Sequence, residues 1–273
     1  MVSSSPGNRY SRIQALEYGA GLVLVSNCGE NMTDWEFRIT DVPHNTELLR
    51  GLKPREIDLI LAAGRPCRFR AKSVMTYQGD PAQYLLLLWK GRARYFYEAP
   101  NDRKHILKGI TPGQIFGGAA LVSQHSTYLV STEAVQDSIV LEWNGPTIRD
   151  FARRYPRLLE NAHLIDMDYV SWFVATHTAL TSQSARKRLA SILFGLAKSV
   201  GRRIPGGIEL DATNEELANS ANITPYTASR LISEWQRSGA IRKHRGKIVL
   251  LSPETFLGWP EAQLRARSNR EKN

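Results

Sequence analysis

The sequence of 273 residues has only two cysteines and no long apolar run. Cys28 and Cys67 cannot form a disulfide framework, and alone they cannot supply the four ligands of an iron–sulfur cluster or a structural zinc site. Unbroken apolar runs, such as residues 85–89, are far below the roughly 20 residues that a membrane helix needs, and no leader with a cleavage site opens the chain. We therefore expect a soluble, cytoplasmic protein without a membrane partner.

Catalytic patterns are also missing. The Ser, His and Asp residues lack the spacing of a nucleophile elbow or a metal site, and there is no phosphate-loop pattern of Gly, Lys and Ser/Thr. His163 and His177, the candidates for a haem ligand, are expected to be surface or packing side chains. We predict that the protein is no enzyme, with no catalytic residue, no metal and no cofactor.

The positive charge is concentrated towards the C-terminus. The net charge is +10, and residues 1–150 hold 17 Lys and Arg against 15 Asp and Glu, whereas residues 151–273 hold 19 against 11. A localised basic surface suits a polyanion such as nucleic acid, because each neutralised phosphate releases condensed counterions. The charge alone is equally consistent with a cationic surface that contacts only water and binds no nucleic acid.

The pattern along the chain divides it into five parts. Residues 1–45 lack sustained periodicity and are expected to be a disordered extension, or an upstream segment if Met32 is the true start. Four parts follow: an all-β domain at 46–145, a long helix at 146–180, a mainly helical domain at 181–252 and a basic tail at 253–273.

Short strand patterns dominate the all-β domain. They follow a short helix and a second helix that starts at Pro54, and turn residues separate them at intervals of roughly 8 to 12 residues, which is typical of an antiparallel sandwich or barrel. The predicted strands are residues 68–75, 83–89, 92–97, 105–110 and 138–143.

A long helix is predicted for residues 156–179. Its apolar positions are spaced alternately by four and three residues, which keeps one stripe facing a partner helix. A second stripe, which includes Leu159, Asp166 and Phe173, could face the all-β domain of the same chain, and a core helix in a monomer is the alternative to a dimer. The predicted dimer interface consists of Leu158, Ala162, Ile165, Tyr169, Trp172 and Thr176.

Residues 211–251 predict a helix-turn-helix followed by a hairpin. Thr213 and Glu216 form a capping box, and Asn222 can adopt the left-handed conformation of a tight turn. Thr224 then caps a second helix, whose Pro225 stands at the first position. In that helix the residues that recur at helical spacing, and must face inward, are Ala228, Leu231, Ile232 and Trp235.

The outward side chains of the second helix are polar, as in a recognition helix that enters the major groove of DNA. The hairpin that follows has a cationic tip and would clamp phosphates as a wing. The predicted DNA-binding residues are Thr224, Tyr226, Thr227, Ser229, Arg230, Lys243, Arg245 and Lys247.

The chain resembles the cyclic-AMP receptor protein and fumarate–nitrate regulator superfamily of bacterial transcription factors over about residues 46–251. The resemblance implies an α+β chain: an N-terminal antiparallel β-roll sensor domain like a cyclic-nucleotide-binding domain at 46–145, a long dimerisation helix at 146–180 and a C-terminal winged helix-turn-helix DNA-binding domain at 181–252. The matching stretches are YQGDPAQYLLLLWKGRARYF (77–96), LKGITPGQIFGG (107–118), AVQDSIVLEW (134–143), ARKRLASILFGLAKSVG (185–201) and TNEELANSANITPYTASRLISEWQRSGAIRKHRGKIVLL (213–251).

The sequence departs from the family pattern in the phosphate cassette. Gly118 stands where the family's ribose-binding glutamate would be, and Tyr128 and Leu129 align with its arginine–serine pair. A buried phosphate without its guanidinium would be uncompensated. We therefore expect that cyclic AMP does not bind in the usual way. The residues expected around the effector pocket are Gly117, Gly118, Ala119, Ala120, Tyr128 and Leu129.

The sequence thus predicts a homodimeric, sequence-specific regulator of transcription. Its expected partners are double-stranded DNA with a pseudo-palindromic operator, a second copy of itself, and RNA polymerase, whereas the effector is unknown. One alternative is a constitutive regulator whose β-roll has lost its ligand. The other is a β-roll scaffold with a protein partner and only non-specific nucleic-acid binding.

Overall fold

The computed structural model describes residues 14–18, 21–25, 46–100, 103–244 and 247–251. The expected disordered extension therefore lies outside the described residues, apart from a short antiparallel hairpin of β1 (Gln14–Tyr18) and β2 (Gly21–Val25). The expected basic tail lies outside them as well. Two compact units divide the chain, Met1–Thr178 and Ala179–Asn273. No helix in the described ranges is long and apolar enough to cross a membrane.

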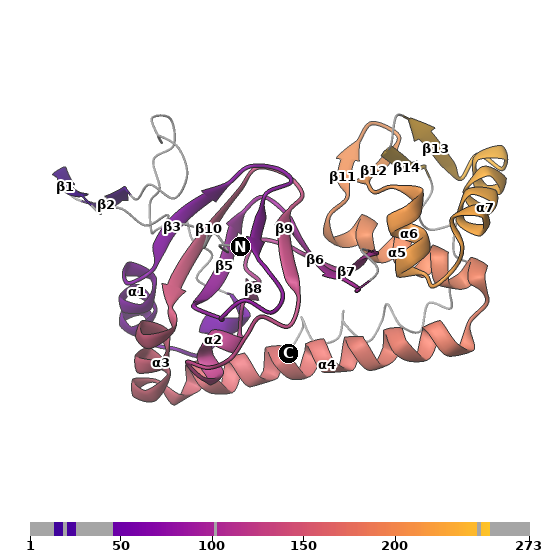
Figure 1. Ribbon diagram of the computed structural model, residues 1–273. Coiled ribbons are helices and arrows are strands. Elements are labelled where there is room, and N and C mark those ends of the chain that lie inside the picture. The colour runs from indigo at the N-terminus through magenta and orange to yellow at the C-terminus, as the bar shows by residue number, and fades with distance from the viewer. Residues whose placement is uncertain (1–13, 19–20, 26–45, 101–102, 245–246, 252–273) are drawn as a thin grey trace, which may run out of the picture. The chain divides into compact units, whose positions relative to one another are not determined.

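The first unit is a β-roll with short helices before and after it (Figure 1). Its elements after β2 are a 3₁₀ helix at Glu47–Leu49, α1 (Pro54–Ala62), β3 (Arg65–Phe69), β4 (Val74–Thr76), β5 (Tyr84–Lys90), β6 (Ala93–Glu98), β7 (Lys104–Ile110), β8 (Ile115–Phe116), α2 (Ala119–Val122), β9 (Ser131–Ala134), β10 (Ser138–Asn144), α3 (Gly145–Arg154) and α4 (Pro156–Ser182), which ends four residues past the unit boundary.

Two antiparallel sheets build the roll. Their strand orders are β3-β10-β5-β8 and β4-β9-β6-β7. In the first sheet, Val140 of β10 lies opposite Cys67 of β3 and Leu88 of β5. In the second, Tyr95 of β6 lies opposite Thr132 of β9. This confirms the antiparallel β architecture that the strand spacing predicts.

The single strand predicted at residues 68–75 is wrong. The chain forms β3, turns at residues 70–73 and enters β4, which belongs to the other sheet. Lys72 has a φ of 70°, and the Ala71 amide donates to Asp137 Oδ1 at 2.9 Å. An apolar pattern records which residues are buried but not which sheet buries them, so the corner between the two strands left no signal in the periodicity.

Strand β5 is buried on both faces, which explains the apolar run at residues 85–89. Side chains alternate between the faces of a strand. Leu85 and Leu87 join a core with α1, α3 and the start of α4, whereas Leu86 and Leu88 pack between the sheets with Phe116. The indole of Trp143, on neighbouring β10, donates to the carbonyl of Ile60 at 2.7 Å and fixes α1 against this core.

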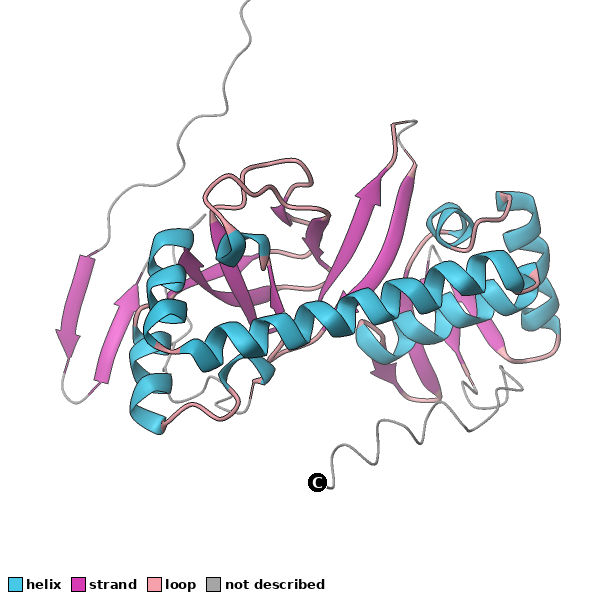
Figure 2. Ribbon diagram, turned by 90° about the horizontal axis from the view of Figure 1, so that it is seen from below, coloured by secondary structure: helices cyan, strands magenta, loops and turns pink. Residues whose placement is uncertain are grey.

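The second unit combines a helix-turn-helix with a four-stranded sheet of order β11-β12-β14-β13. Figure 2 shows its strands lying against its own helices. Its elements are α5 (Ala185–Ser199), β11 (Arg202–Ile204), β12 (Gly207–Asp211), α6 (Asn214–Ser220), α7 (Pro225–Arg237), β13 (Ile241–His244) and β14 (Lys247–Leu250).

The local signals predicted for this unit are confirmed. The Thr213 hydroxyl accepts from the Glu216 amide, and the Glu216 carboxylate accepts from the Thr213 amide at 2.8 Å. Asn222 has a φ of 50°, in the left-handed region, and the Thr224 hydroxyl accepts from the Thr227 amide at 3.1 Å. The hairpin β11–β12 was not predicted, although Pro205–Gly207 marks its turn.

Candidate functional site

Helix α7 has an apolar inner face and a polar outer face. The four residues expected inside are buried: Ala228, Leu231, Ile232 and Trp235. Tyr226, Ser229 and Arg230 are exposed, Tyr226 by 78%. Thr227 is half-buried, and Thr224 is exposed while its hydroxyl serves as the helix cap. The five predicted contacts on this helix therefore lie together near its first two turns.

The Glu234 carboxylate holds two guanidinium groups on the surface of α7. Arg230 Nη1 donates to Glu234 Oε1 at 2.5 Å, one turn away, and Arg186 of α5 pairs with the other carboxylate oxygen. The guanidinium carbon of Arg186 also lies 5.6 Å from the centre of the Trp235 ring. This ion pair holds the Arg230 guanidinium along the surface of α7, where its side chain is about half exposed.

The predicted wing is the hairpin of β13 and β14. Lys243 is exposed on β13, and Arg245 lies outside the described residues. Lys247 instead binds Glu209 of β12, with Nζ 3.0 Å from Oε1, and Arg202 binds the same oxygen at 2.7 Å. Hydrogen bonds from Arg202 and Lys247 lower the pKa of Glu209 below its usual value. Part of the charge of Lys247 is therefore compensated within the chain.

Arg188 of α5 fixes the turn between α6 and α7. Its Nε donates to the carbonyl of Ala221 at 2.8 Å, and its Nη2 donates to that of Asn222 at 3.0 Å. Its Nη1 donates to the carbonyl of Gln183, between α4 and α5, at 2.7 Å. One guanidinium thus ties the turn that positions α7 to the start of this unit.

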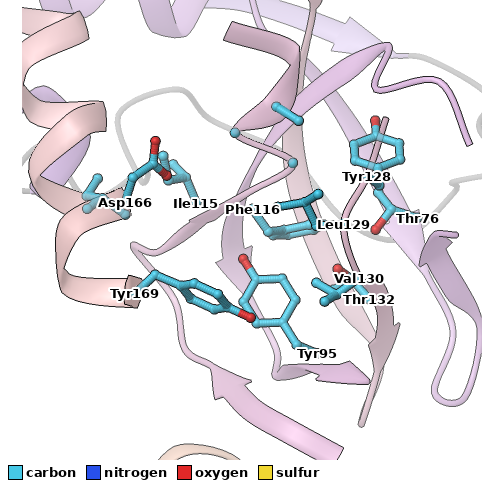
Figure 3. Close-up of a pocket in the computed structure, with 14 residues that line it drawn as sticks. Thr76, Tyr95, Ile115, Phe116, Tyr128, Leu129, Val130, Thr132, Asp166 and Tyr169 are labelled. Carbon is cyan, nitrogen blue, oxygen red and sulfur yellow. The ribbon is translucent and has the colours of Figure 1, made fainter. Parts of the chain in front are cut away.

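A cavity of about 160 Å³ lies in the β-roll beside α4 (Figure 3). Five of the six residues predicted around an effector line it; Ala120 is instead buried in a small core with Ala82 and Tyr128. The lining consists of Thr76, Tyr95, Ile115, Phe116, Gly117, Gly118, Ala119, Tyr128, Leu129, Val130, Thr132, Ile165, Asp166 and Tyr169.

Tyr128 occupies one side of this cavity and bonds to the backbone of β5. Its hydroxyl accepts from the Tyr84 amide and donates to the Tyr84 carbonyl, both at 3.0 Å. Burial raises the pKa of Tyr128 to about 12. A Cβ atom on Gly117 would lie 2.6 Å from the Tyr84 carbonyl oxygen, so a glycine is required there, as its φ of 76° also indicates.

Asp166 and Tyr169 reach the cavity from α4, opposite Tyr128 and Thr76 (Figure 3). The Tyr169 ring meets that of Tyr95 edge to face, with centroids 5.7 Å apart and planes at 81°. Burial raises the pKa of Asp166, while His163 lowers it. The periodicity placed Asp166 on a stripe that could face the sensor domain, but nothing in the sequence marked it or Tyr95 as pocket residues.

The cavity lining has no basic side chain, and no group of three potential metal ligands occurs among the residues that the structure describes. A phosphate in the cavity would thus meet no guanidinium or ammonium group. The only charged side chain in the lining is the carboxylate of Asp166.

The dimer stripe predicted on α4 is wrong for its first residues. Leu158 and Ala162 are buried in the core of their own unit, with Ile165 packed against it. Tyr169 lines the cavity and contacts Trp172, with ring centroids 5.5 Å apart. Of the six residues, Thr176 shows no such contact and is half-buried. The two stripes were told apart by spacing, but only packing decides which one covers the β-roll.

Another face of α4 carries exposed apolar side chains. Leu164 is 64% exposed, Met167 59% and Val174 57%. With Ser171 and Thr178, these residues follow a spacing of three and four, which is the seam pattern of paired helices. Val170 and Phe173 of the second stripe are exposed as well.

Family models match both units. Residues 66–155 match the cyclic nucleotide-binding domain, and residues 187–257 match the Crp-like helix-turn-helix domain. The chain is 25% identical over 201 residues to the cyclic AMP receptor protein of Thermus thermophilus, covering 74% of this chain and 90% of that protein. It is 23% identical over 221 residues to the CRP-like cAMP-activated global transcriptional regulator of Mycobacterium tuberculosis, covering 75% and 92%.

Solved structures share the fold. The c-di-GMP responsive global regulator CLP of Xanthomonas campestris aligns with a TM-score of 0.63 at 20% identity, over 72% of this chain and 99% of that one. FixK2 of Bradyrhizobium japonicum aligns with a TM-score of 0.59 at 17% identity, over 71% and 96%. The two family models in this order, with these relatives, identify the chain as a member of the cyclic-AMP receptor protein and fumarate–nitrate regulator (CRP/FNR) superfamily of transcription regulators.

Proposed function

We propose that this protein is a homodimeric transcription regulator that binds a specific DNA sequence through α7. The outer face of α7 is the observation on which the proposal mainly rests, because it presents Tyr226, Ser229 and an oriented Arg230 near the helix N-terminus, where a recognition helix contacts base edges. Lys243 on the exposed edge of the wing suits a neighbouring phosphate.

The exposed stripe of Leu164, Met167 and Val174 supports dimerisation along α4. Exposed apolar side chains at seam spacing are stabilised when a second copy covers them. A two-fold dimer would present two α7 helices to successive major grooves, about 34 Å apart, on a pseudo-palindromic operator.

The cavity supports the proposal that cyclic AMP is not the effector. Its lining offers a carboxylate and no cation, so the nucleotide phosphate would be repelled and uncompensated. An engineered cavity of about 150 Å³ holds benzene, which makes a cavity of about 160 Å³ small for a purine, a ribose and a phosphate together.

RNA polymerase is the further partner expected of a transcription regulator. The competing function is a β-roll scaffold for a protein partner, with only non-specific binding of nucleic acid by the basic second unit. Selection of sites from random DNA tests the two, because a specific regulator enriches a two-fold symmetric sequence.

Salt-titrated binding to the selected site and to random DNA then measures the specificity. We expect the selected site to be favoured by roughly 10³-fold or more. Equal affinities at every salt concentration, or no enriched sequence, would show that the chain holds nucleic acid without specificity and would contradict the proposed function.

A further inference from the structure

We propose that the β-roll cavity binds a small organic ammonium ion, held by the Asp166 carboxylate and the rings of Tyr95 and Tyr169. The inference rests on the proposed function only for its regulatory meaning, since such a ligand would be the effector. The binding itself follows from the side chains that line the cavity.

Three polar groups at the cavity lack a partner. Neither the Asp166 carboxylate nor the hydroxyls of Tyr95 and Tyr169 make a hydrogen bond or an ion pair with the part of the chain that the structure describes. Tyr128, by contrast, is fully bonded to the backbone of Tyr84. Asp166 is exposed, whereas Tyr95 and Tyr169 are half-buried. The carboxylate and the two hydroxyls are therefore all accessible to a hydrogen-bond donor with positive charge.

The aromatic side chains favour the same charge. The faces of tyrosine rings attract cations, most strongly where water is excluded. Tyr95 and Tyr169 stand at 81° to each other, and Figure 3 shows the Tyr169 hydroxyl reaching towards the Tyr95 ring. An ammonium group beside Asp166 would therefore meet a carboxylate and two rings at once.

Other charged groups nearby do not line the cavity. His163 lies one turn before Asp166 on α4 and lowers the pKa of its carboxyl group. Lys108 of β7 lies over Tyr169 and Trp172, with Nζ 5.9 Å from each ring centre. Asp166 is thus the only charged side chain that the lining offers to a ligand.

Gly118 leaves room for the carboxylate. A Cβ atom at this position would lie 3.6 Å from Asp166 Oδ1, with no other atom within 4 Å, and the backbone there is in an ordinary helical conformation. The backbone at residue 118 can therefore carry a larger side chain, and that side chain would occupy the space beside Asp166. The volume of about 160 Å³ is close to that of an engineered cavity that holds benzene, so a ligand with a single ring has a suitable size.

Three single-ring probes of similar size test the charge requirement on the full chain. Benzylammonium, benzyl alcohol and benzoate differ mainly in the charge of the group attached to the ring. We expect benzylammonium to bind, by calorimetry and ligand-observed NMR, at least tenfold more tightly than the other two. Failure of benzylammonium to bind, or equal binding of benzyl alcohol or benzoate, would overturn the proposal.

Two variants locate the site. Asp166→Asn and Gly118→Leu should each weaken the binding of benzylammonium at least tenfold. Asp168 is an exposed carboxylate on the same helix, and Asp168→Asn should leave this binding unchanged. Thermal melting of each variant checks that the fold persists. An Asp166→Asn variant that melts like the parent and binds benzylammonium equally well would also overturn the assignment.

The DNA affinity of the same preparations, measured without probe, separates this inference from the proposed function. Specific DNA binding without benzylammonium binding would refute the ammonium site alone. Benzylammonium binding without specific DNA binding would refute the proposed function and leave the site standing.

Discussion

Arg230 and Glu234 face each other one turn apart on α7, with Nη1 2.5 Å from Oε1. Glu234 also binds Arg186 of α5, so its carboxylate is anchored from the neighbouring helix. The other N–H groups of Arg230 make no bond within the described residues. A guanidinium has five N–H donors, and Arg230 uses only Nη1 to bind Glu234. The remaining N–H groups can still donate together to O6 and N7 of guanine.

Arg230→Ala should therefore weaken binding to the selected site far more than binding to random DNA. The expected loss is about 1–3 kcal/mol of base discrimination at one base pair in each half-site. Competition binding with operators changed at single positions measures it.

Lys243→Ala is the matched comparison, because a flexible ammonium group binds phosphate without selecting a base. It should weaken binding to the selected site and to random DNA about equally. The slope of log affinity against log salt concentration should fall by about one for each phosphate that the lysine no longer neutralises. Indistinguishable profiles for the Arg230 and Lys243 variants would show that the recognition face is assigned wrongly.

Leu164→Asp combined with Val174→Asp should give monomers. Burial of one Leu or Val contributes about 1.5–3 kcal/mol, and a dimer would bury two copies of each. Analytical ultracentrifugation measures the loss, and Val122→Asp, an equally exposed apolar residue on α2, is the control. A double variant that still sediments as a dimer would exclude this face as the seam.

Cyclic AMP should leave the affinity for the selected operator unchanged. The cavity has no cation for the phosphate, and the hydroxyl of Tyr128 is committed to Tyr84. Calorimetry and operator titration with and without the nucleotide check this expectation. Low-micromolar binding coupled to tighter DNA binding would show that the phosphate finds another partner.

Tyr128→Phe should destabilise the first unit by about 1–3 kcal/mol, because the amide and carbonyl of Tyr84 lose a buried partner. The raised pKa of Tyr128 also predicts a pH dependence. The unfolded chain ionises near pH 10 and the folded chain near 12, so this contribution is complete below pH 10 and is lost as the pH approaches 12.

Denaturant unfolding of the parent and the Tyr128→Phe variant over this pH range measures the difference. Because the other tyrosines are present in both proteins, their effect cancels when the two unfolding free energies are subtracted. A gap in unfolding free energy that stays constant up to pH 12 would contradict the assigned burial of the hydroxyl.

Arg188→Ala should lower the melting temperature of the second unit and weaken specific DNA binding. The guanidinium bonds three carbonyls, of Gln183, Ala221 and Asn222, and the expected loss of stability is about 1–3 kcal/mol. Arg188→Lys should restore little, since one ammonium group cannot span the three oxygens. Full rescue by lysine would show that only the charge matters.

The sequence alone determined the helix-turn-helix and its boundaries. The capping box at Thr213 and the cap at Thr224 depend on hydrogen bonds between residues three apart, and Asn222 is a residue type that tolerates a left-handed φ. Such local hydrogen bonds are encoded by neighbouring residue types, so they are predictable before the fold is known. The buried face of α7 follows in the same way from its spacing.

Tertiary structure alone decided the partners of residues far apart in the chain. More than one face of α4 satisfies helical spacing, and packing against the β-roll determines that Leu158 is buried while Leu164, which lies on neither predicted stripe, is exposed. Lys247 binds Glu209 across the sheet, and Asp166 meets the cavity beside Gly118. Periodicity records that a face is buried but not what buries it, because packing joins residues whose separation along the chain has no fixed pattern.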